Sequence, residues 1–178
     1  ITRRASTDEG GDRFVCDTGG GQRPTITERS WRTIGEQTGL TTELHPYQTD
    51  DYIVHQVMSA VTKAKIKGRL DPVLLLVHHA TYITTKQDPL EKESLMTTMD
   101  MGNHGIFCDG THPSQPKCGI TVKNTFLPFQ HDHESIYFDI SKPTEDEMAL
   151  YEIFELNSRE PPKVQRTASS LKRKRENY

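Results

Sequence analysis

The chain has 178 residues, which is the length of one domain with extended ends, and its formal net charge is only −3. It has no apolar run of about 18 residues and only three cysteines, so we exclude a transmembrane helix and a disulfide scaffold and expect a soluble intracellular protein. The net charge conceals a strong segregation: residues 31–156 carry eighteen acidic and ten basic side chains, whereas residues 157–178 carry two acidic and seven basic ones. The acidic middle repels nucleic-acid phosphates, so any phosphate contact must come from the tail or a small local patch.

The apolar residues are unevenly distributed along the chain. Of the 37 Leu, Ile, Val and Phe residues, 31 lie between positions 31 and 156. A segment with few apolar side chains cannot offset the entropy of ordering itself. We therefore expect a flexible arm over 1–30, one folded domain over 31–156 and a basic disordered tail over 157–178. The first residue is Ile1 and not Met, so we expect a processed or a trimmed chain.

The first two elements are predicted to be helices. Residues 27–39 begin with a capping threonine, carry an early acid and end at a glycine, a pattern typical of a short helix. Residues 50–67 show the clearest helical spacing, since Val57, Val61 and Ala64 follow steps of four and three residues behind an acidic first turn. We expect this second helix to pack against a sheet.

Strands dominate the next part of the chain. Residues 73–77 form a continuous branched apolar run, which predicts a central strand buried on both faces and continuing to residue 83. Residues 85–103 lack sustained periodicity, so we expect a long loop there or a short helix at 90–98. Three further strands are predicted, at 105–108, 119–125 and 135–140.

The last element before the tail fits either a helix or a strand. Thr144 and Glu147 have the spacing of a capping box, which predicts a helix over 145–156. The alternating apolar residues from Met148 onward leave a strand open as the alternative.

Together these elements predict an α+β fold. We expect a mostly antiparallel sheet that includes residues 73–77 and is packed by one or two helices, with the helix at 50–67 as the main one. A β-sandwich with peripheral helices is the alternative architecture. No internal repeat is apparent.

One group of potential metal ligands lies in a turn-rich segment. Four side chains with soft or borderline donors fall within fifteen residues: His104, Cys108, His112 and Cys118. A tight loop lets four such donors converge on a tetrahedral ion, so we predict a structural zinc site. The spacing lacks the paired knuckles of common zinc fingers, and buried cysteines with solvated histidines are the alternative interpretation.

Two groups of basic residues are candidates for phosphate contact. The first lies at the end of the predicted helix: Lys63, Lys65, Lys67 and Arg69. Cations also favour a helix C-terminus without any ligand. The second is the tail quartet: Lys172, Arg173, Lys174 and Arg175. A dense basic run in an exposed tail is typical of a nuclear-import signal and equally of a phosphate-binding arm.

The residues indicate no particular reaction, and no Gly-x-Ser-x-Gly elbow of a hydrolase occurs. We therefore expect a non-enzymatic nuclear or nucleic-acid-associated interaction protein, such as a processed viral protein. Its tail would contact nucleic acid or an import receptor, its acidic body would bind other proteins, and no membrane contact is expected. Two alternatives remain open. One is a metal-dependent nuclease that uses acids such as Asp88 and Glu91, and the other is a viral shell subunit whose tail contacts the genome.

Overall fold

The protein is mostly β. The computed structural model describes residues 11–17, 23–35, 41–44, 53–110 and 118–160, and the structural statements below concern these residues. Among them, 52% lie in strands and 10% in helices. The predicted α+β fold is therefore wrong, and so is the sandwich alternative, because the main sheet closes on itself. A closed sheet encloses its own core and needs no covering layer of helices.

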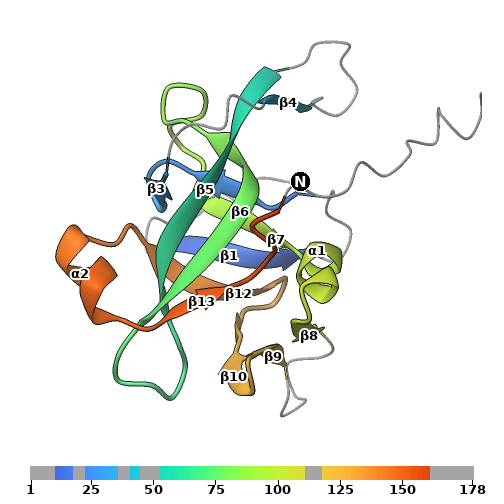
Figure 1. Ribbon diagram of the computed structural model, residues 1–178, viewed down its shortest axis with the longest axis vertical. Helices are drawn as coiled ribbons and strands as arrows, with labels where there is room; N and C mark the ends of the chain where they lie inside the picture. The colour runs from blue at the N-terminus through green and yellow to red at the C-terminus, as the bar shows by residue number, and fades with distance from the viewer. Residues whose placement is uncertain (1–10, 18–22, 36–40, 45–52, 111–117, 161–178) are drawn as a thin grey trace, which may run out of the picture.

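Six strands form the closed barrel (Figure 1). In order around the barrel they are β12 (Ile136–Ser141), β1 (Asp12–Asp17), β7 (Glu93–Thr97), β2 (Thr25–Thr27), β6 (Val73–Ile83) and β5 (Ile53–Lys65). The antiparallel pairing of β12 with β5 completes the ring. Two neighbouring pairs are parallel, namely β1 with β7 and β2 with β6.

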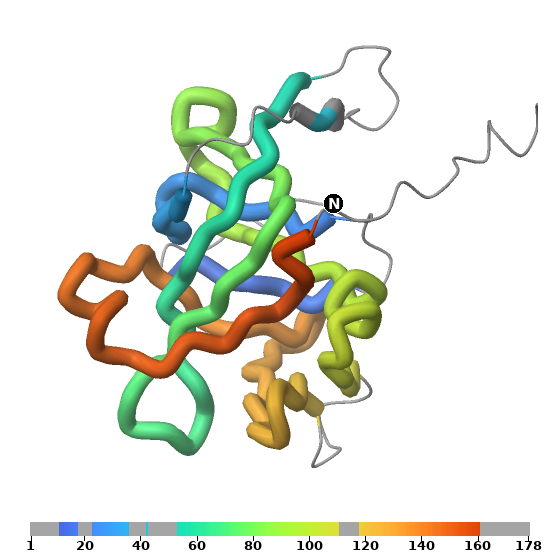
Figure 2. The backbone as a smooth tube through the Cα atoms, viewed as in Figure 1, coloured from blue at the N-terminus to red at the C-terminus, as the bar shows by residue number. Residues whose placement is uncertain are grey.

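Shorter elements surround the barrel. Four strands extend its sheet: β3 (Arg32–Ile34), β4 (Thr41–Leu44), β11 (Gln130–His131) and β13 (Ile153–Glu155). Three strands form a second, small sheet: β8 (Phe107–Asp109), β9 (Gly119–Val122) and β10 (Thr125–Pro128). The helices of the described ranges are α1 (Thr98–Asn103) and α2 (Glu145–Leu150). Although β13 is distant in sequence, it pairs in parallel with β6, along the same edge of β6 that pairs with β2 (Figure 2).

The predicted helix at 50–67 is wrong over its described part, which is strand β5. A step of four residues keeps two side chains on the same face of a helix, and an even step does the same in a strand. Val57 and Val61 thus share one face of β5, whereas Ala64 lies on the other. Ala64 packs into the barrel core and Val61 into a smaller outer cluster. Apolar side chains on both faces therefore produced a spacing that resembles a helix.

The predicted helix at 27–39 is also wrong over its described part, which contains the end of β2, a turn and β3. Trp31 follows the turn and is completely buried. Its indole Nε1 donates a hydrogen bond to Ser94 Oγ at 2.8 Å, and its ring meets Phe14 edge-on with centroids 5.0 Å apart. The burial of this large side chain holds the turn against the core. A helix pattern of nearby residues does not predict this long-range contact.

The helix prediction at 145–156 is right for its first part. The Glu147 N–H donates to Thr144 Oγ1 at 3.2 Å, and Glu147 Oε1 accepts from the Thr144 N–H at 3.1 Å, so the predicted capping box is present. Helix α2 ends at Leu150. The strand alternative is confirmed from Ile153 onward, where the chain forms β13.

The other strand predictions are confirmed with shifted ends. Strand β6 covers the predicted run, and β8, β9 and β12 overlap the three ranges expected after it. The short helix predicted at 90–98 is wrong, and the long loop predicted over 85–103 is right only for residues 85–92, because residues 93–97 pair with β1 as β7 and α1 begins at Thr98. Strands β1 and β2 lie among residues expected to form an arm, so the barrel begins before residue 31.

The small sheet has one buried and one exposed face. Ile120 and Leu127 are fully buried against the barrel core. On the opposite face, Phe107 and Phe126 lie in register on either side of Thr121, and their side chains remain 68% and 39% exposed. Exposed aromatic side chains are enriched where proteins contact other molecules.

Candidate functional site

A β-bulge in the barrel wall organises a polar cluster on its outer face. The register between β5 and β6 shifts so that His78 and His79 together oppose Ser59. His79 adopts a φ of +52°, a left-handed conformation that is uncommon for residues other than glycine. Bulges re-aim side chains and occur often beside active sites. Here the bulge turns His78 toward polar partners on both neighbouring strands.

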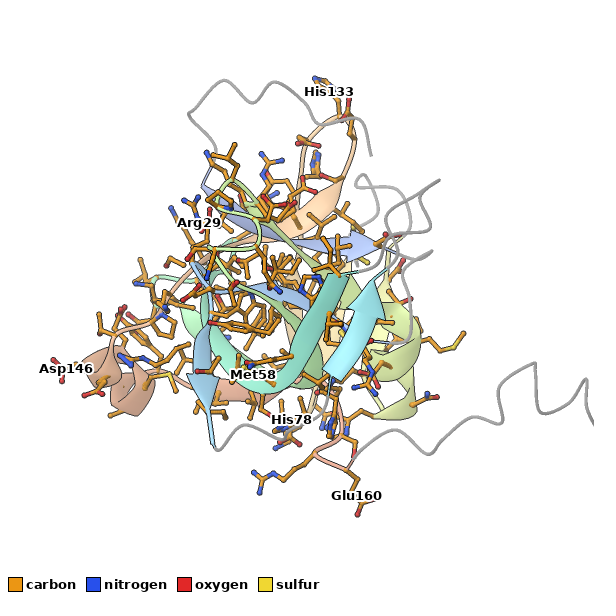
Figure 3. All side chains as sticks on the ribbon, turned by 90° about the horizontal axis from the view of Figure 1, so that it is seen from above. Arg29, Met58, His78, His133, Asp146 and Glu160 are labelled. Carbon is orange, nitrogen blue, oxygen red and sulfur yellow. The ribbon has the colours of Figure 1, made fainter. Side chains whose placement is uncertain are left out.

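Ser59, His78 and Glu155 form a continuous hydrogen-bonded chain across β5, β6 and β13. Ser59 Oγ lies 2.9 Å from His78 Nδ1, and His78 Nε2 lies 3.0 Å from Glu155 Oε2. The His78 side chain is 5% exposed and that of Glu155 is 31% exposed, so the imidazole is enclosed and the carboxylate reaches solvent. In Figure 3, His78 lies on the same side of the molecule as Glu160 and away from His133.

Glu155 is the acidic member of this chain. The hydrogen bond from His78 lowers the pKa of the Glu155 carboxyl, and partial burial opposes that effect without cancelling it. His104 Nε2 lies 3.5 Å from the second carboxylate oxygen, Oε1. An ionised carboxylate accepts hydrogen bonds only, so it holds the His78 proton on Nε2. His78 Nδ1 can then accept the hydroxyl hydrogen of Ser59.

Asn157 acts as the strand partner of His78. On this edge of β6, pairing with β13 covers residues 74–76 and pairing with β2 starts at Thr81, which leaves His78 between them. The His78 N–H donates to Asn157 Oδ1 at 2.6 Å, and Asn157 Nδ2 donates to the His78 carbonyl at 2.7 Å. Asn157 Nδ2 also donates to Asp100 Oδ2 at 2.7 Å. The buried amide thus fixes the backbone that carries the imidazole.

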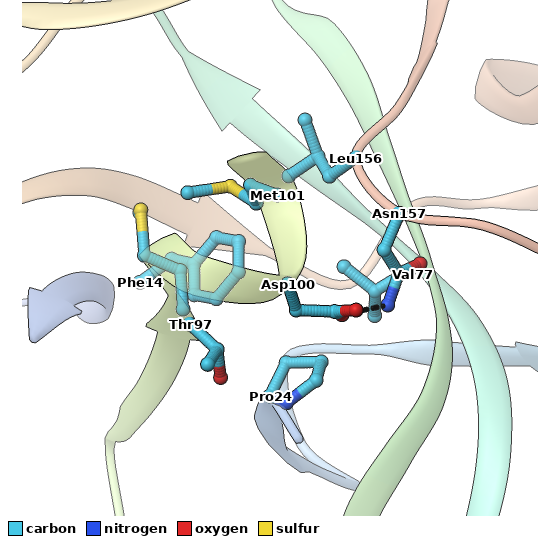
Figure 4. A pocket seen from close by; sticks show the side chains of 9 residues that line it. Phe14, Pro24, Val77, Thr97, Asp100, Met101, Leu156 and Asn157 are labelled. Atoms are coloured by element: carbon cyan, nitrogen blue, oxygen red, sulfur yellow. Dashed lines mark hydrogen bonds between the residues drawn. The ribbon is translucent and has the colours of Figure 1, made fainter. Parts of the chain in front are cut away.

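A small cavity lies on the inner side of this network (Figure 4). The hydrogen bond between Asp100 and Asn157 borders it, and apolar side chains such as Phe14, Val77 and Met101 make up much of the remaining wall. The volume of this cavity is about 10 Å³, which is enough for about one water molecule. An organic ligand does not fit there, so we look for chemistry at the outer cluster.

The outer cluster has the order of groups that activates a hydroxyl. A base that accepts the hydroxyl proton makes the oxygen a nucleophile, and a third group keeps the base in the right tautomer. Ser59, His78 and Glu155 occupy these three positions within hydrogen-bond distance. Strands carry all three residues, so the backbone that positions them is rigid.

The residues predicted to bind zinc are only partly brought together. His104 Nε2 faces Glu155, whereas Cys108 Sγ faces Cys16 Sγ at 3.6 Å. Cys118 is buried. Burial is the largest cause that raises the pKa of its thiol, and the nearby Asp109 and Cys108 raise it further. His112 lies outside the described residues. No group of three or more His, Cys, Asp and Glu side chains in the described ranges is arranged to hold a metal ion, so the four-ligand site stays a prediction.

Cys16, which the sequence pattern did not single out, is the partner of Cys108. The pair joins β1 to the small sheet across 92 positions of sequence. The hydrogen bond between the two thiols lowers the pKa of the Cys108 thiol and raises that of Cys16. A thiol with a lowered pKa forms the thiolate, which is the form that reacts.

We expect a mild thiol oxidant to form a disulfide between Cys16 and Cys108. The two sulfur atoms need to approach from 3.6 Å to the roughly 2.05 Å of an S–S bond. The bond would stabilise the folded state by about 2–4 kcal/mol, as for other long loops. Mass spectrometry of the digested protein tests this as a cross-linked peptide pair. Cys118→Ser serves as control and should leave the cross-link intact, whereas absence of the Cys16–Cys108 peptide pair from the oxidised, folded wild-type protein would contradict the pairing.

Two of the four residues of the predicted phosphate patch on the body are paired with acids. Lys63 Nζ lies 2.6 Å from Glu147 Oε2, and an Arg69 nitrogen lies 3.6 Å from a Glu152 oxygen. The other two members of the patch, Lys65 and Lys67, are exposed. The tail quartet Lys172, Arg173, Lys174 and Arg175 lies outside the described residues.

Comparison with known protein families, curated proteins and solved structures finds no match to this chain. Neither α1 nor α2, the helices of the described ranges, is long and apolar enough to cross a bilayer.

Sequence reasoning missed Ser59, His78, Glu155 and Cys16. These residues come from distant positions and meet only because β5, β6 and β13 are neighbours and β1 faces the small sheet. One local signal was available: two adjacent polar histidines, His78 and His79, end an otherwise apolar run in β6. Polar residues within a buried strand often mark a bulge or a functional position.

Proposed function

We propose that this protein is a nuclear or nucleic-acid-associated interaction protein whose basic tail supplies the contact with phosphate or with an import receptor. The observation that carries the proposal is the separation of charge, since the tail has seven basic and two acidic residues behind a strongly acidic body. Each cation that meets a phosphate releases a condensed counterion, which favours binding without any base-specific contact.

The ion pairs of the body support a role for the tail. A cation that is already bound to a carboxylate must lose that partner to contact phosphate. The pairs of Lys63 with Glu147 and of Arg69 with Glu152 therefore weaken the patch at the end of β5. In the sequence, the quartet Lys172, Arg173, Lys174 and Arg175 follows eleven residues that include no acid, and one acid, Glu176, comes directly after it. We therefore assign the phosphate contact to the quartet and not to the body.

The test is the affinity of the full chain for a short DNA duplex, measured by fluorescence anisotropy over a range of salt concentrations. Replacing the four quartet residues by Ala should weaken binding and make the slope of log K against log salt less steep by about 3 to 4. The matched control removes four cations from the body: Lys63, Lys65, Lys67 and Arg69. That control should leave the salt slope unchanged, with folding of both variants verified by circular dichroism.

A fluorescent fusion of the full chain tests the cellular part of the proposal. It should accumulate in the nucleus, and the quartet variant should not. Nuclear accumulation and DNA affinity that both survive loss of the quartet would reject the proposal. Two other results would favour the alternatives: cleavage of DNA that requires a divalent ion and is lost in Asp88→Ala and Glu91→Ala, or assembly of regular particles on nucleic acid.

A further inference from the structure

We propose that Ser59, His78 and Glu155 constitute a nucleophile, base and orienting carboxylate that hydrolyse carboxylic esters of aliphatic acyl groups. This activity goes beyond the proposed interaction function and does not depend on it, because it uses the barrel wall and not the tail. It also departs from the expectation that the protein is non-enzymatic, which rested on the lack of a linear hydrolase motif.

The geometry places each group within reach of the next. The Ser59 hydroxyl is 2.9 Å from His78 Nδ1, and His78 Nε2 is 3.0 Å from Glu155 Oε2. The imidazole therefore presents Nδ1 to the serine and Nε2–H to the carboxylate, with the two nitrogens exchanged relative to the arrangement in chymotrypsin-like proteases. Such triads are recognised by geometry and roles and not by sequence order.

The backbone around His78 is irregular, and neighbouring groups hold it in place. A bulge places two residues of β6 opposite Ser59, and His79 holds a left-handed φ of +52° to make this possible. The side-chain amide of Asn157 replaces the missing ladder bonds of His78. Strained or irregular backbone that neighbouring groups hold in place is concentrated at functional sites.

The outer face next to Ser59 indicates the class of acyl group. Ile34 of β3 lies directly opposite Ser59 in the antiparallel pairing and therefore shares its face of the sheet. Ile34, Met148 and Tyr151 are only partly buried and pack against an outer cluster of Val61, Leu74 and Leu76, in which Val61 lies two residues beyond Ser59. An aliphatic chain bound to Ser59 would lie along this apolar surface, which favours esters of alkanoic acids over charged or sugar-like acyl groups.

The reaction proceeds in two balanced steps. Ser59 Oγ attacks the ester carbonyl carbon while its proton moves to His78 Nδ1. The bond from the carbonyl carbon to the alkoxy oxygen then breaks, and the leaving alkoxide takes that proton and departs as an alcohol. A water molecule attacks the resulting acyl-serine, gives one proton to His78 Nδ1, and the bond to Ser59 Oγ breaks as the serine regains the proton. Glu155 stays ionised and keeps the second proton on Nε2.

The first test is covalent labelling of the full chain with a fluorophosphonate probe, followed by peptide mass spectrometry. A single adduct on Ser59 is expected, absent in Ser59→Ala and retained in Ser141→Ala, an exposed strand serine that serves as matched control. Tail variants with the quartet replaced should label normally, so failure of this proposal and failure of the proposed function are distinguishable.

The second test is hydrolysis of p-nitrophenyl butyrate. Ser59→Ala should abolish turnover above the uncatalysed rate, and His78→Gln should lower kcat by about 10²- to 10⁴-fold, the usual contribution of a general base. Glu155 is a positioning residue, so Glu155→Gln should lower kcat and leave KM unchanged, whereas a merely structural loss would reduce the fraction of active protein. The proposal is overturned if folded wild-type protein shows neither adduct nor turnover, or if folded Ser59→Ala retains both.

Discussion

Replacing Asn157 by Ala is expected to lower the free energy of unfolding by about 3 kcal/mol. The side chain is 3% exposed and supplies both hydrogen bonds that the His78 backbone would otherwise receive from a neighbouring strand. Without it, a buried N–H and a buried carbonyl lose their partners in the barrel wall, and each unpaired group costs about 1–3 kcal/mol. Chemical denaturation followed by circular dichroism gives the change directly.

Two further variants separate the contributions around Asn157. Asp100→Ala leaves the two bonds to His78 in place and should cost about 1 kcal/mol. Asn103→Ala removes an exposed amide at the end of α1 and should be nearly neutral. The explanation fails if Asn157→Ala costs no more than Asn103→Ala. If His78 is the base inferred above, labelling of Ser59 should also fall in folded Asn157→Ala, because His78 is no longer held at its backbone.

Trp31→Ala is expected to be more damaging, with a loss of about 4 kcal/mol. The indole is completely buried, packs edge-on against Phe14 and donates a hydrogen bond to Ser94 Oγ. Its removal leaves a cavity in the core and an unpaired hydroxyl on Ser94. The loss is measured by thermal and chemical denaturation, and the variant should have a Tm well below that of the wild-type protein.

Trp31→Phe separates packing from hydrogen bonding. It keeps most of the apolar volume and loses the indole N–H, so we expect a smaller loss of about 1–2 kcal/mol. Leu90→Ala is a suitable control, since that side chain is 74% exposed and its truncation should change stability little. Equal losses for Trp31→Ala and Leu90→Ala would show that the turn after β2 does not depend on the indole.

Local patterns predicted the elements whose signals are short in range. The capping box of α2 needs only Thr144 and Glu147, three residues apart, and it is present. The branched apolar run of β6 is buried on both faces, and it appears as expected. Strand β5 failed the same reasoning, because its faces contact two different clusters and their combined apolar residues mimic a helical repeat.

The candidate sites also combine features that a local pattern predicts with contacts that it does not predict. The sequence pattern placed Cys108 among four predicted zinc ligands, but its partner Cys16 lies on β1 and could not be found by local spacing. Lys63 appeared as part of a phosphate patch, yet Glu147 from α2 lies against it. Charge and composition are additive along a chain, whereas the partner of an individual charge depends on which elements become neighbours.

Composition and short-range patterns were enough to predict the separation of acidic from basic segments, strand β6 and the cap of α2. Each of these depends on composition or on residues a few positions apart. The tertiary structure alone decided that the sheet closes into a barrel, that a bulge places His78 opposite Ser59 and that Glu155 completes their hydrogen-bonded chain. These features depend on strand order and register, which are set by the packing of residues far apart in the chain.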